Sequence, residues 1–332
     1  MSEPEHHPVR FALAVAGVFV AGMLTAVQSR INGQLAHDTG DAFVTSVISF
    51  GSGLVILGAG LLFARAGRAG IRQVVGAVRG GRMPWWYLAG GTAGAVFVLT
   101  QSLVVALIGV ALFTVGIVAG QLSSSVIVDR RGLGTMAPQP FRLPRVLAAV
   151  LALVGVIVAV SGEVRGDVPF GLLVLPVIAG ALVGMQAALN GQVRRVASSA
   201  YTATFANFVV GTTLLVLICA VHLAIEPWTV ALPPNPLLYL GGTVGVVFIA
   251  AQAVLVRTTG VLVLGLAVLS GQLVMAVVFD AVLPLPGNTL TFVGLLGAAL
   301  TLVAVVIAVI PARRPRGRQL SAWNPSDREF MQ

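Results

Sequence analysis

The stretch WYLAGGTAGAVFVLTQSLVVALIGVALFTVGIVAGQLSSSVIV, residues 86–128, contains no charged side chain. As a single α-helix it would be about 64 Å long at 1.5 Å per residue, roughly twice the thickness of the hydrocarbon core of a bilayer. It must therefore turn back on itself. Gly109 is the predicted turning point, because glycine interrupts helices more readily than its neighbours here. We expect two membrane-spanning helices in this stretch.

The composition of the 332-residue chain also indicates that lipid is its solvent. Hydrophobic residues make up 57% and charged residues 9% of the chain, which leaves too few polar side chains to cover a water-soluble protein. A net charge of +9 would suggest a nucleic-acid partner in a soluble protein. Here every basic residue is an arginine, mainly between apolar runs. We interpret these arginines as marking the loops that face the cytoplasm, and we expect no nucleic-acid partner.

Neither metal nor redox chemistry is expected. The single cysteine, Cys219, lies within an apolar run and has no partner for an intramolecular disulfide. The four histidines fall in predicted loops and tails and are too scattered for a ligand cluster. No nucleotide-binding motif is present. We therefore predict no catalytic residues, no metal and no cofactor.

Apolar runs bounded by charge, proline or glycine predict ten spanning helices. The expected ranges are 11–31, 43–63, 86–106, 110–128, 145–161, 169–189, 201–221, 237–256, 261–283 and 289–310. With the N-terminus inside, eighteen of the twenty arginines face the cytoplasm, and only Arg30 and Arg165 remain outside. The sequence thus predicts a multi-pass protein of the cytoplasmic (inner) membrane with both termini cytoplasmic.

The chain contains an internal repeat. Residues 21–34 match 179–192 at an offset of 158, and residues 90–129 align without gaps to 241–280 at an offset of 151, with 15 identities in 40 positions. Glycine- and valine-rich segments match often by chance. However, eight of the twelve glutamines form four pairs at these two offsets, which composition bias does not explain.

The repeat divides the chain into a five-helix half at residues 1–164, a second at 165–312, and a basic cytoplasmic tail at 313–332. Because five is odd, the second half must enter the membrane in the opposite orientation. The arginine-rich segment at 65–82 has its counterpart at 222–236, which contains no arginine. We therefore predict an all-α membrane protein of two inverted five-helix repeats, a plan used for alternating access.

The repeated motifs suggest a family. Gln-x-x-x-Asn-Gly-Gln begins at Gln28 and again at Gln186, followed by Ser-Phe or Asn-Phe, then Gly-Gly-Thr and Gly-Gln motifs in both halves. This pattern resembles the YdcZ-like branch of the drug/metabolite transporter superfamily, as a fused pair of its five-helix units. The resemblance covers nearly the whole chain. It implies a DMT/EamA-like fold and a bacterial inner-membrane exporter of small molecules, and it carries no agreed binding residues.

Intramembrane amides are the candidate substrate-binding groups. Each could instead be a hydrogen-bonding contact between helices. The eight residues are Gln28, Asn32, Gln101, Gln121, Gln186, Asn190, Gln252 and Gln272. Gln28 with Asn32, and Gln186 with Asn190, are spaced for one helical face and are expected at opposite membrane faces, as two gates would be. We expect Gln121 and Gln272 near the midplane, facing each other across a central cavity.

Two carboxylates end paired helices. Asp129 and Asp280 are therefore the candidates for proton coupling, and the alternative is that both are ordinary interfacial residues.

The function predicted from these features is secondary transport of a small amphiphilic or cationic molecule. A membrane-embedded enzyme or lipid-handling protein would need a nucleophile, a metal cluster or paired carboxylates at one face, and the sequence offers none. A non-transporting membrane subunit is the third reading, but it would not require paired glutamines in both halves. The expected partners are the substrate and the lipid bilayer, and the sequence leaves a homodimer open.

Overall fold

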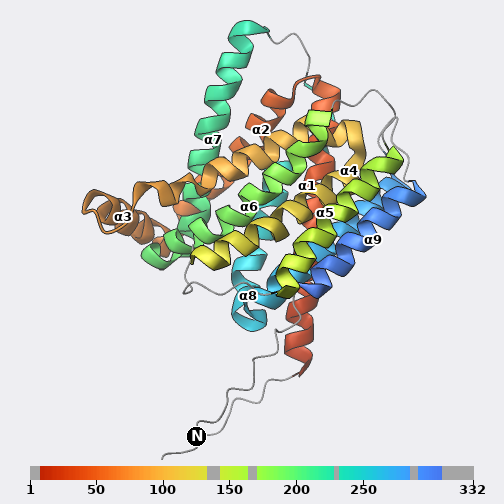
Figure 1. Ribbon diagram of the computed structural model, residues 1–332. Coiled ribbons are helices and arrows are strands. Elements are labelled where there is room, and N and C mark those ends of the chain that lie inside the picture. Colours follow the sequence, from red (N-terminus) through yellow and green to blue (C-terminus); the bar gives the residue numbers. More distant parts are fainter. Residues whose placement is uncertain (1–7, 133–142, 164–169, 228–231, 285–290, 309–332) are drawn as a thin grey trace, which may run out of the picture.

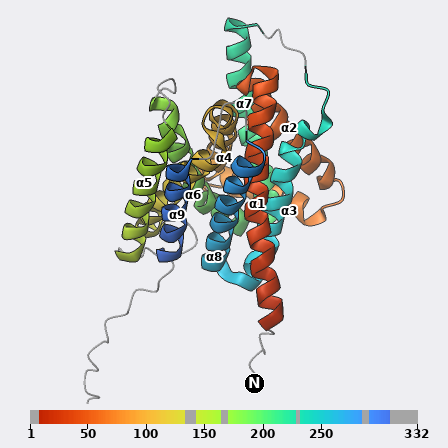
Figure 2. The same ribbon diagram turned by 90° about the vertical axis from the view of Figure 1, so that its right-hand side faces the viewer.

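The computed structural model describes residues 8–132, 143–163, 170–227, 232–284 and 291–308, which form a helical bundle (Figure 1; Figure 2). The α-helices are α1 (Pro8–Thr39), α2 (Ala42–Leu61), α3 (Arg65–Arg79), α4 (Gly90–Arg131), α5 (Leu143–Glu163), α6 (Phe170–Ala197), α7 (Ala200–Ile225), α8 (Gly241–Val282) and α9 (Phe292–Ile307). Two short 3-10 helices, η1 (Trp85–Ala89) and η2 (Pro236–Tyr239), precede α4 and α8. The described residues contain no strand, so the predicted all-α class is confirmed for them.

Seven helices in the described ranges are long and apolar enough to cross a membrane. They are Val9–Thr39, Ala42–Leu61, Trp85–Val128, Leu143–Ser161, Val174–Ala197, Ala200–Ile225 and Val263–Val282. Gly241–Gln252 and Phe292–Ile307 are apolar but shorter. Large hydrophobic side chains such as Val55, Ile157 and Leu217 are exposed. Acyl chains would solvate such a surface, as expected of a membrane protein.

Helix α4 folds back on itself at Gly109. The ring centroids of Phe97 and Phe113 lie 6.1 Å apart, whereas a straight helix would separate these positions by about 24 Å. Gly109 has φ 81° and ψ 167°, a backbone conformation that only glycine adopts without strain. The prediction that the uncharged stretch turns back at this residue is confirmed.

Helix α8 folds back as well. Near its start, Gly245 lies against the side chain of Gln28, and further along the chain Gly271 lies against the backbone of Met23. Gln28 and Met23 are about 8 Å apart along α1, but the two glycines would be about 39 Å apart in a straight helix. The first and second parts of α8 therefore both contact the same part of α1.

The two folded-back helices pack across the two halves of the chain. Helix α1 packs along α8, and α6 packs along α4. A Cβ on Gly22 would overlap the backbone of Val268, and one on Gly180 would overlap the backbone of Ile117. Gly22 and Gly180 are 158 residues apart, and Ile117 and Val268 are 151 apart. The same close approach thus occurs twice, at the two offsets found in the sequence.

Several predicted boundaries were wrong. Helices α1 and α6 continue to Thr39 and Ala197, so the expected loop regions beyond residues 31 and 189 are largely helical. Helix α2 begins after the N-cap Asp41, and α7 begins after the N-cap Ser199.

Three features expected in loops are helical instead. His37 lies in α1 and His222 in the last turn of α7. The basic segment expected to be a loop forms α3.

Candidate functional site

The first polar cluster joins α1, α4 and α8. We call it the first joint and define it by Gln28, Ser29, Asn32, Gln101 and Gly241. Asn32 donates from Nδ2 to Oε1 of Gln101 at 2.8 Å, and Gln101 donates from Nε2 to Oγ of Ser29 at 2.8 Å. Gln28 donates from Nε2 to the carbonyl of Gly241 at 2.8 Å. Because Asn32 and Gln101 are both 0% exposed, these bonds lock three helices together in a water-free contact.

The second polar cluster contains Gln186 and Asn190, the counterparts of Gln28 and Asn32. We call it the second joint and define it by Gln186, Asn190, Asn207, Gly90 and Gly94. Asn207 donates from Nδ2 to Oδ1 of Asn190 at 3.3 Å. A Cβ on Gly90 would lie 2.7 Å from Oδ1 of Asn190, and one on Gly94 would lie 3.0 Å from Nε2 of Gln186. Glycine at these positions lets the backbone of α4 approach the amides of α6.

The two joints differ in whether the helices that carry their Asn and Gln residues pack together. In the first joint, α1 packs on α4, whereas α6 and α8, the corresponding helices of the second joint, have at most marginal contact within the described residues. Gln252, which corresponds to Gln101, is partly exposed, as are Gln186 and Asn190. A Cβ on Gly33 would lie 2.6 Å from Cγ1 of Val105, but nothing lies within 4 Å of one on Gly191. The first joint is closed and the second is open.

The midplane candidates lie next to the helix-crossing glycines. Gln121 follows Gly120, which lies against the carbonyl of Val177 on α6, and Gln272 follows Gly271, which lies against the carbonyl of Phe19 on α1. Gln272 is 1% exposed, and its Nε2 has no hydrogen-bond partner in the described structure. Gln121 is partly exposed. An unpartnered buried amide donor is costly in apolar surroundings, so the Nε2 of Gln272 is an unsatisfied group in the helix contact.

Asp280 has a structural role that the sequence did not indicate. Its carboxylate accepts hydrogen bonds from the backbone N–H of Val110 at 3.0 Å and of Ala111 at 2.6 Å. It therefore caps the second part of α4 directly after the turn at Gly109. It is 8% exposed, so its side chain is buried among the helices. The side chain of Asp129 lies outside the described residues.

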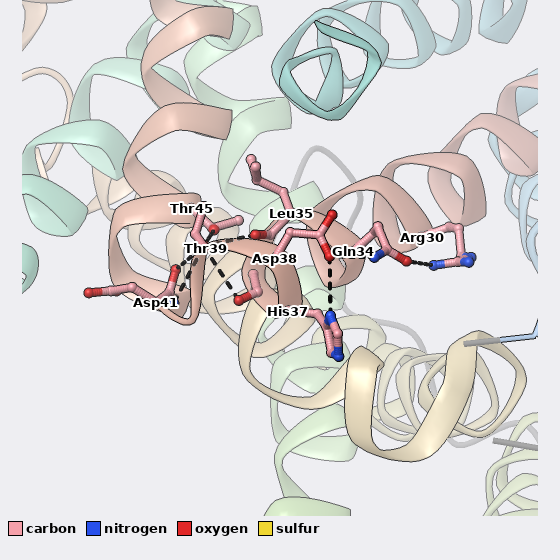
Figure 3. Close-up of polar contacts among 9 residues, drawn as sticks. Arg30, Gln34, Leu35, His37, Asp38, Thr39, Asp41 and Thr45 are labelled. Atoms are coloured by element: carbon pink, nitrogen blue, oxygen red, sulfur yellow. Dashed lines mark hydrogen bonds and ion pairs between the residues drawn. The ribbon is translucent and has the colours of Figure 1, made fainter. Parts of the chain in front are cut away.

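A polar ladder at the end of α1 was missed at the sequence level (Figure 3). Arg30 donates from Nη1 to Oε1 of Gln34 at 2.9 Å, and Gln34 donates from Nε2 to Oδ1 of Asp38 at 2.7 Å. The spacing of four residues, which places these side chains on one helical face, could have revealed it.

A second polar contact ties α7 to the start of α2. Nε2 of His222 lies 3.1 Å from Oδ2 of Asp41, and Phe43 stacks on the imidazole with ring centroids 4.3 Å apart. No local pattern could have shown it, because the partners are 181 residues apart. Within the described residues, no group of three or more His, Cys, Asp or Glu side chains could hold a metal ion.

Long apolar helices, two of them folded back on themselves, define a multi-pass helical membrane protein. Residues 13–158 and 171–307 each match the model of a family described as "Putative inner membrane exporter, YdcZ". These two matches cover most of the chain, which therefore belongs to this YdcZ family of the drug/metabolite transporter superfamily. Membership in a family described as exporters implies a transporter rather than an enzyme. No curated protein matches the chain.

Proposed function

We propose that this chain is a secondary transporter that exports a small organic molecule across the inner membrane by alternating access. The observation that carries this proposal is the difference between the two joints. Two sets of matching polar residues occupy matching positions, yet only the first joint is closed. A pair of equivalent contacts, of which one is made at a time, is what alternating access requires.

The proposed architecture has ten spanning segments in two inverted halves. Counting the folded-back helices α4 and α8 as two segments each gives five segments before residue 164 and five after it, with α3 outside the count. The duplicated family match and the duplicated contacts of Gly22 and Gly180 support this division. An odd number of segments in each half then inverts the second half.

We assign the structure to the inward-open state. The open second joint lies toward the end of α6 that carries Arg194 and Arg195. By the positive-inside bias this end faces the cytoplasm, with both chain termini on the same side. The closed first joint then seals the outer face. In the opposite state Asn190 would meet Gln252, and the contact between Asn32 and Gln101 would open.

The proposed substrate is a neutral or cationic amphiphile. The candidate interior groups are amides, which both donate and accept hydrogen bonds and so can hold such a ligand without an uncompensated buried charge. We propose that Gln121 and Gln272 bind it near the midplane. Gln28, Asn32 and Gln101 would close the outer gate, and Gln186, Asn190 and Gln252 the inner one.

Coupling to protons, if present, would use Asp129 and Asp280. Protonation of Asp280 would weaken its acceptor role toward the N–H groups of Val110 and Ala111, and so would release the cap of the second part of α4. Protonation of Asp280 would thus be linked to the position of the second part of α4, and this link is the physical reason for proposing Asp280 as a proton-coupling residue.

Two other functions and one assembly remain alternatives. A lipid-handling protein or membrane enzyme would act on bilayer components without moving a solute between compartments. A non-transporting subunit would show no solute flux at all. A homodimer is also open as the working assembly.

A single glycine tests the proposal. Gly191 faces open space here, but in the opposite state it would meet Val256, the residue that corresponds to Val105. Gly191→Val should therefore fold normally and lose transport, because it blocks closure of the second joint. Gly58→Val is the matched control, since Gly58 also faces open space but belongs to neither joint.

The measurement is flux of a panel of amphiphilic cations and neutral amphiphiles in reconstituted vesicles, with and without a pH gradient. Flux in the unaltered chain and the control but not in Gly191→Val supports alternating access. Equal flux in both variants would contradict it, and absence of flux from every protein would favour the non-transporting alternatives.

A further inference from the structure

Helix α3 is a surface helix with one face buried against the bundle. It lies at the edge of the bundle in Figure 1 and packs on the corner between α6 and α7. Its buried residues are Gly67, Gly70, Val74 and Ala77. Thr202 of α7 donates from Oγ1 to the carbonyl of Gly67 at 3.0 Å. Small residues on this face let α3 lie close to the corner.

The opposite face of α3 carries a narrow stripe of arginines. Arg65, Arg68, Arg72 and Arg79 are all exposed. At about 100° per residue they fall within about 60° of one another around the helix axis. The buried glycines and alanine lie on the other side of that axis. The four arginines therefore lie in one row about 20 Å long on the exposed side of the helix.

No acidic side chain pairs with this charge in the described residues. The sequence contains no Asp or Glu between Asp41 and Asp129. In the described part of the chain, no ion pair to Arg65, Arg72 or Arg79 is found, while Arg68 donates to the carbonyls of Leu61 and Leu62 at the end of α2. A row of like charges at this spacing repels itself, so an anionic partner would stabilise it.

Exposed apolar side chains flank the stripe. Leu62 and Phe63, which directly precede α3, are 72% and 86% exposed, and Trp85, which follows it, is 72% exposed. Val75 on α3 itself is also exposed. Aromatic and aliphatic anchors beside a row of arginines are typical of a helix that lies at the headgroup level of a bilayer.

We propose that the outer face of α3 binds the phosphate groups of anionic phospholipids in the leaflet it faces, with Phe63, Val75 and Trp85 at the acyl boundary. The guanidinium fork matches a phosphate through paired hydrogen bonds. The corresponding segment at 222–236 contains no arginine, so the surface is a property of the first half alone. This site does not depend on the transport activity.

Lipid binding to the purified full-length chain tests the proposal. Native mass spectrometry in a neutral detergent, with added phosphatidylglycerol or phosphatidylcholine, gives the Kd of each lipid. The variant R65Q/R72Q/R79Q leaves the Arg68 contact intact. It should weaken phosphatidylglycerol binding by roughly one hundredfold, from about fivefold for each basic residue at an anionic surface. Phosphatidylcholine binding should not change, and inorganic phosphate should not compete.

Two controls separate the helix from net charge. R65K/R72K/R79K keeps the charge and should bind phosphatidylglycerol within a few-fold of the unaltered chain. R313Q/R314Q/R316Q removes the same charge from the C-terminal tail and should leave that binding unchanged. An unaltered phosphatidylglycerol Kd in R65Q/R72Q/R79Q, or equal losses in that variant and the tail variant, would overturn the proposal.

Discussion

Asn32 donates a 2.8 Å hydrogen bond to Gln101, whereas their counterparts Asn190 and Gln252 are partly exposed on helices that hardly touch within the described residues. The same pair of residue types is thus joined in one half and separated in the other. Because the two pairs are chemically alike, the difference lies in how their helices are placed relative to one another.

Chemical crosslinking should reveal this difference in solution. In a background of Cys219→Ser, cysteines at Asn32 and Gln101 should link efficiently with a short bifunctional thiol reagent, and cysteines at Asn190 and Gln252 should link slowly. Adding Ser29→Ala and Gln101→Ala to the second pair weakens the first joint, so it should raise the linked fraction by a population shift. An unchanged linked fraction would argue that the two joints are independent.

Gly109→Ala should destabilise the protein. Its φ of 81° disfavours any side chain, and a Cβ would lie 2.7 Å from Oδ2 of Asp280. We expect a loss of about 1–3 kcal/mol in the free energy of unfolding, measured by denaturant titration in detergent micelles. Gly58→Ala, in open space on α2, is the control and should be neutral or slightly stabilising. Equal stability of both variants would count against the strained turn.

Asp280→Asn separates capping from proton coupling. Asparagine can still accept a backbone hydrogen bond but cannot titrate in this range. We expect Asp280→Asn to keep only one of the two cap bonds, because its amide nitrogen cannot accept, and Asp280→Ala to lose both bonds at Val110 and Ala111 and about 1 kcal/mol or more. If the carboxylate also carries protons, flux driven by a pH gradient should disappear in the folded Asp280→Asn protein. Undiminished pH-driven flux would leave Asp280 as a cap only.

Gln272→Leu and Gln101→Leu should differ in their effect on the free energy of unfolding. Gln101→Leu removes bonds to Asn32 and Ser29 and should lower the free energy of unfolding by about 0.6 kcal/mol or more. Gln272→Leu removes a buried donor that has no partner in the described structure, so stability should hold or rise, while substrate binding should fall. Gln121→Leu should also lose binding. Normal binding in the folded Gln121→Leu/Gln272→Leu protein would refute the midplane site.

Cysteine labelling should establish the orientation of the two halves. Thr39 and Ala197 are equivalent positions of the repeat, but both are buried. His37 and Arg195 are exposed and also 158 residues apart, so they are better positions for the cysteines. In a Cys219→Ser background, an impermeant thiol reagent should label His37→Cys from outside and Arg195→Cys from the cytoplasm. Labelling of both from one side would contradict the inverted repeat.

The sequence alone was sufficient for features that depend on local chemistry. The uncharged stretch at 86–128 exceeds the bilayer thickness, so a turn was required, and glycine at 109 provided the place for it. The segment that forms α3 was expected to be a cytoplasmic loop because its arginines indicate the membrane side. The spacing of those arginines also has a helical period and could have predicted the helix. The family motifs were also visible without coordinates, because they recur in both halves.

Only the tertiary structure decided which distant segments meet. The cap from Asp280 to Val110 joins residues 170 positions apart, and no local pattern specifies such a contact. The pairing of α1 with α8 and of α6 with α4 likewise depends on how the halves interlock. The two joints share Gln, Asn and Gly at matching positions, although Ser29 corresponds to Ala187, and which of them is closed depends on the relative positions of whole helices.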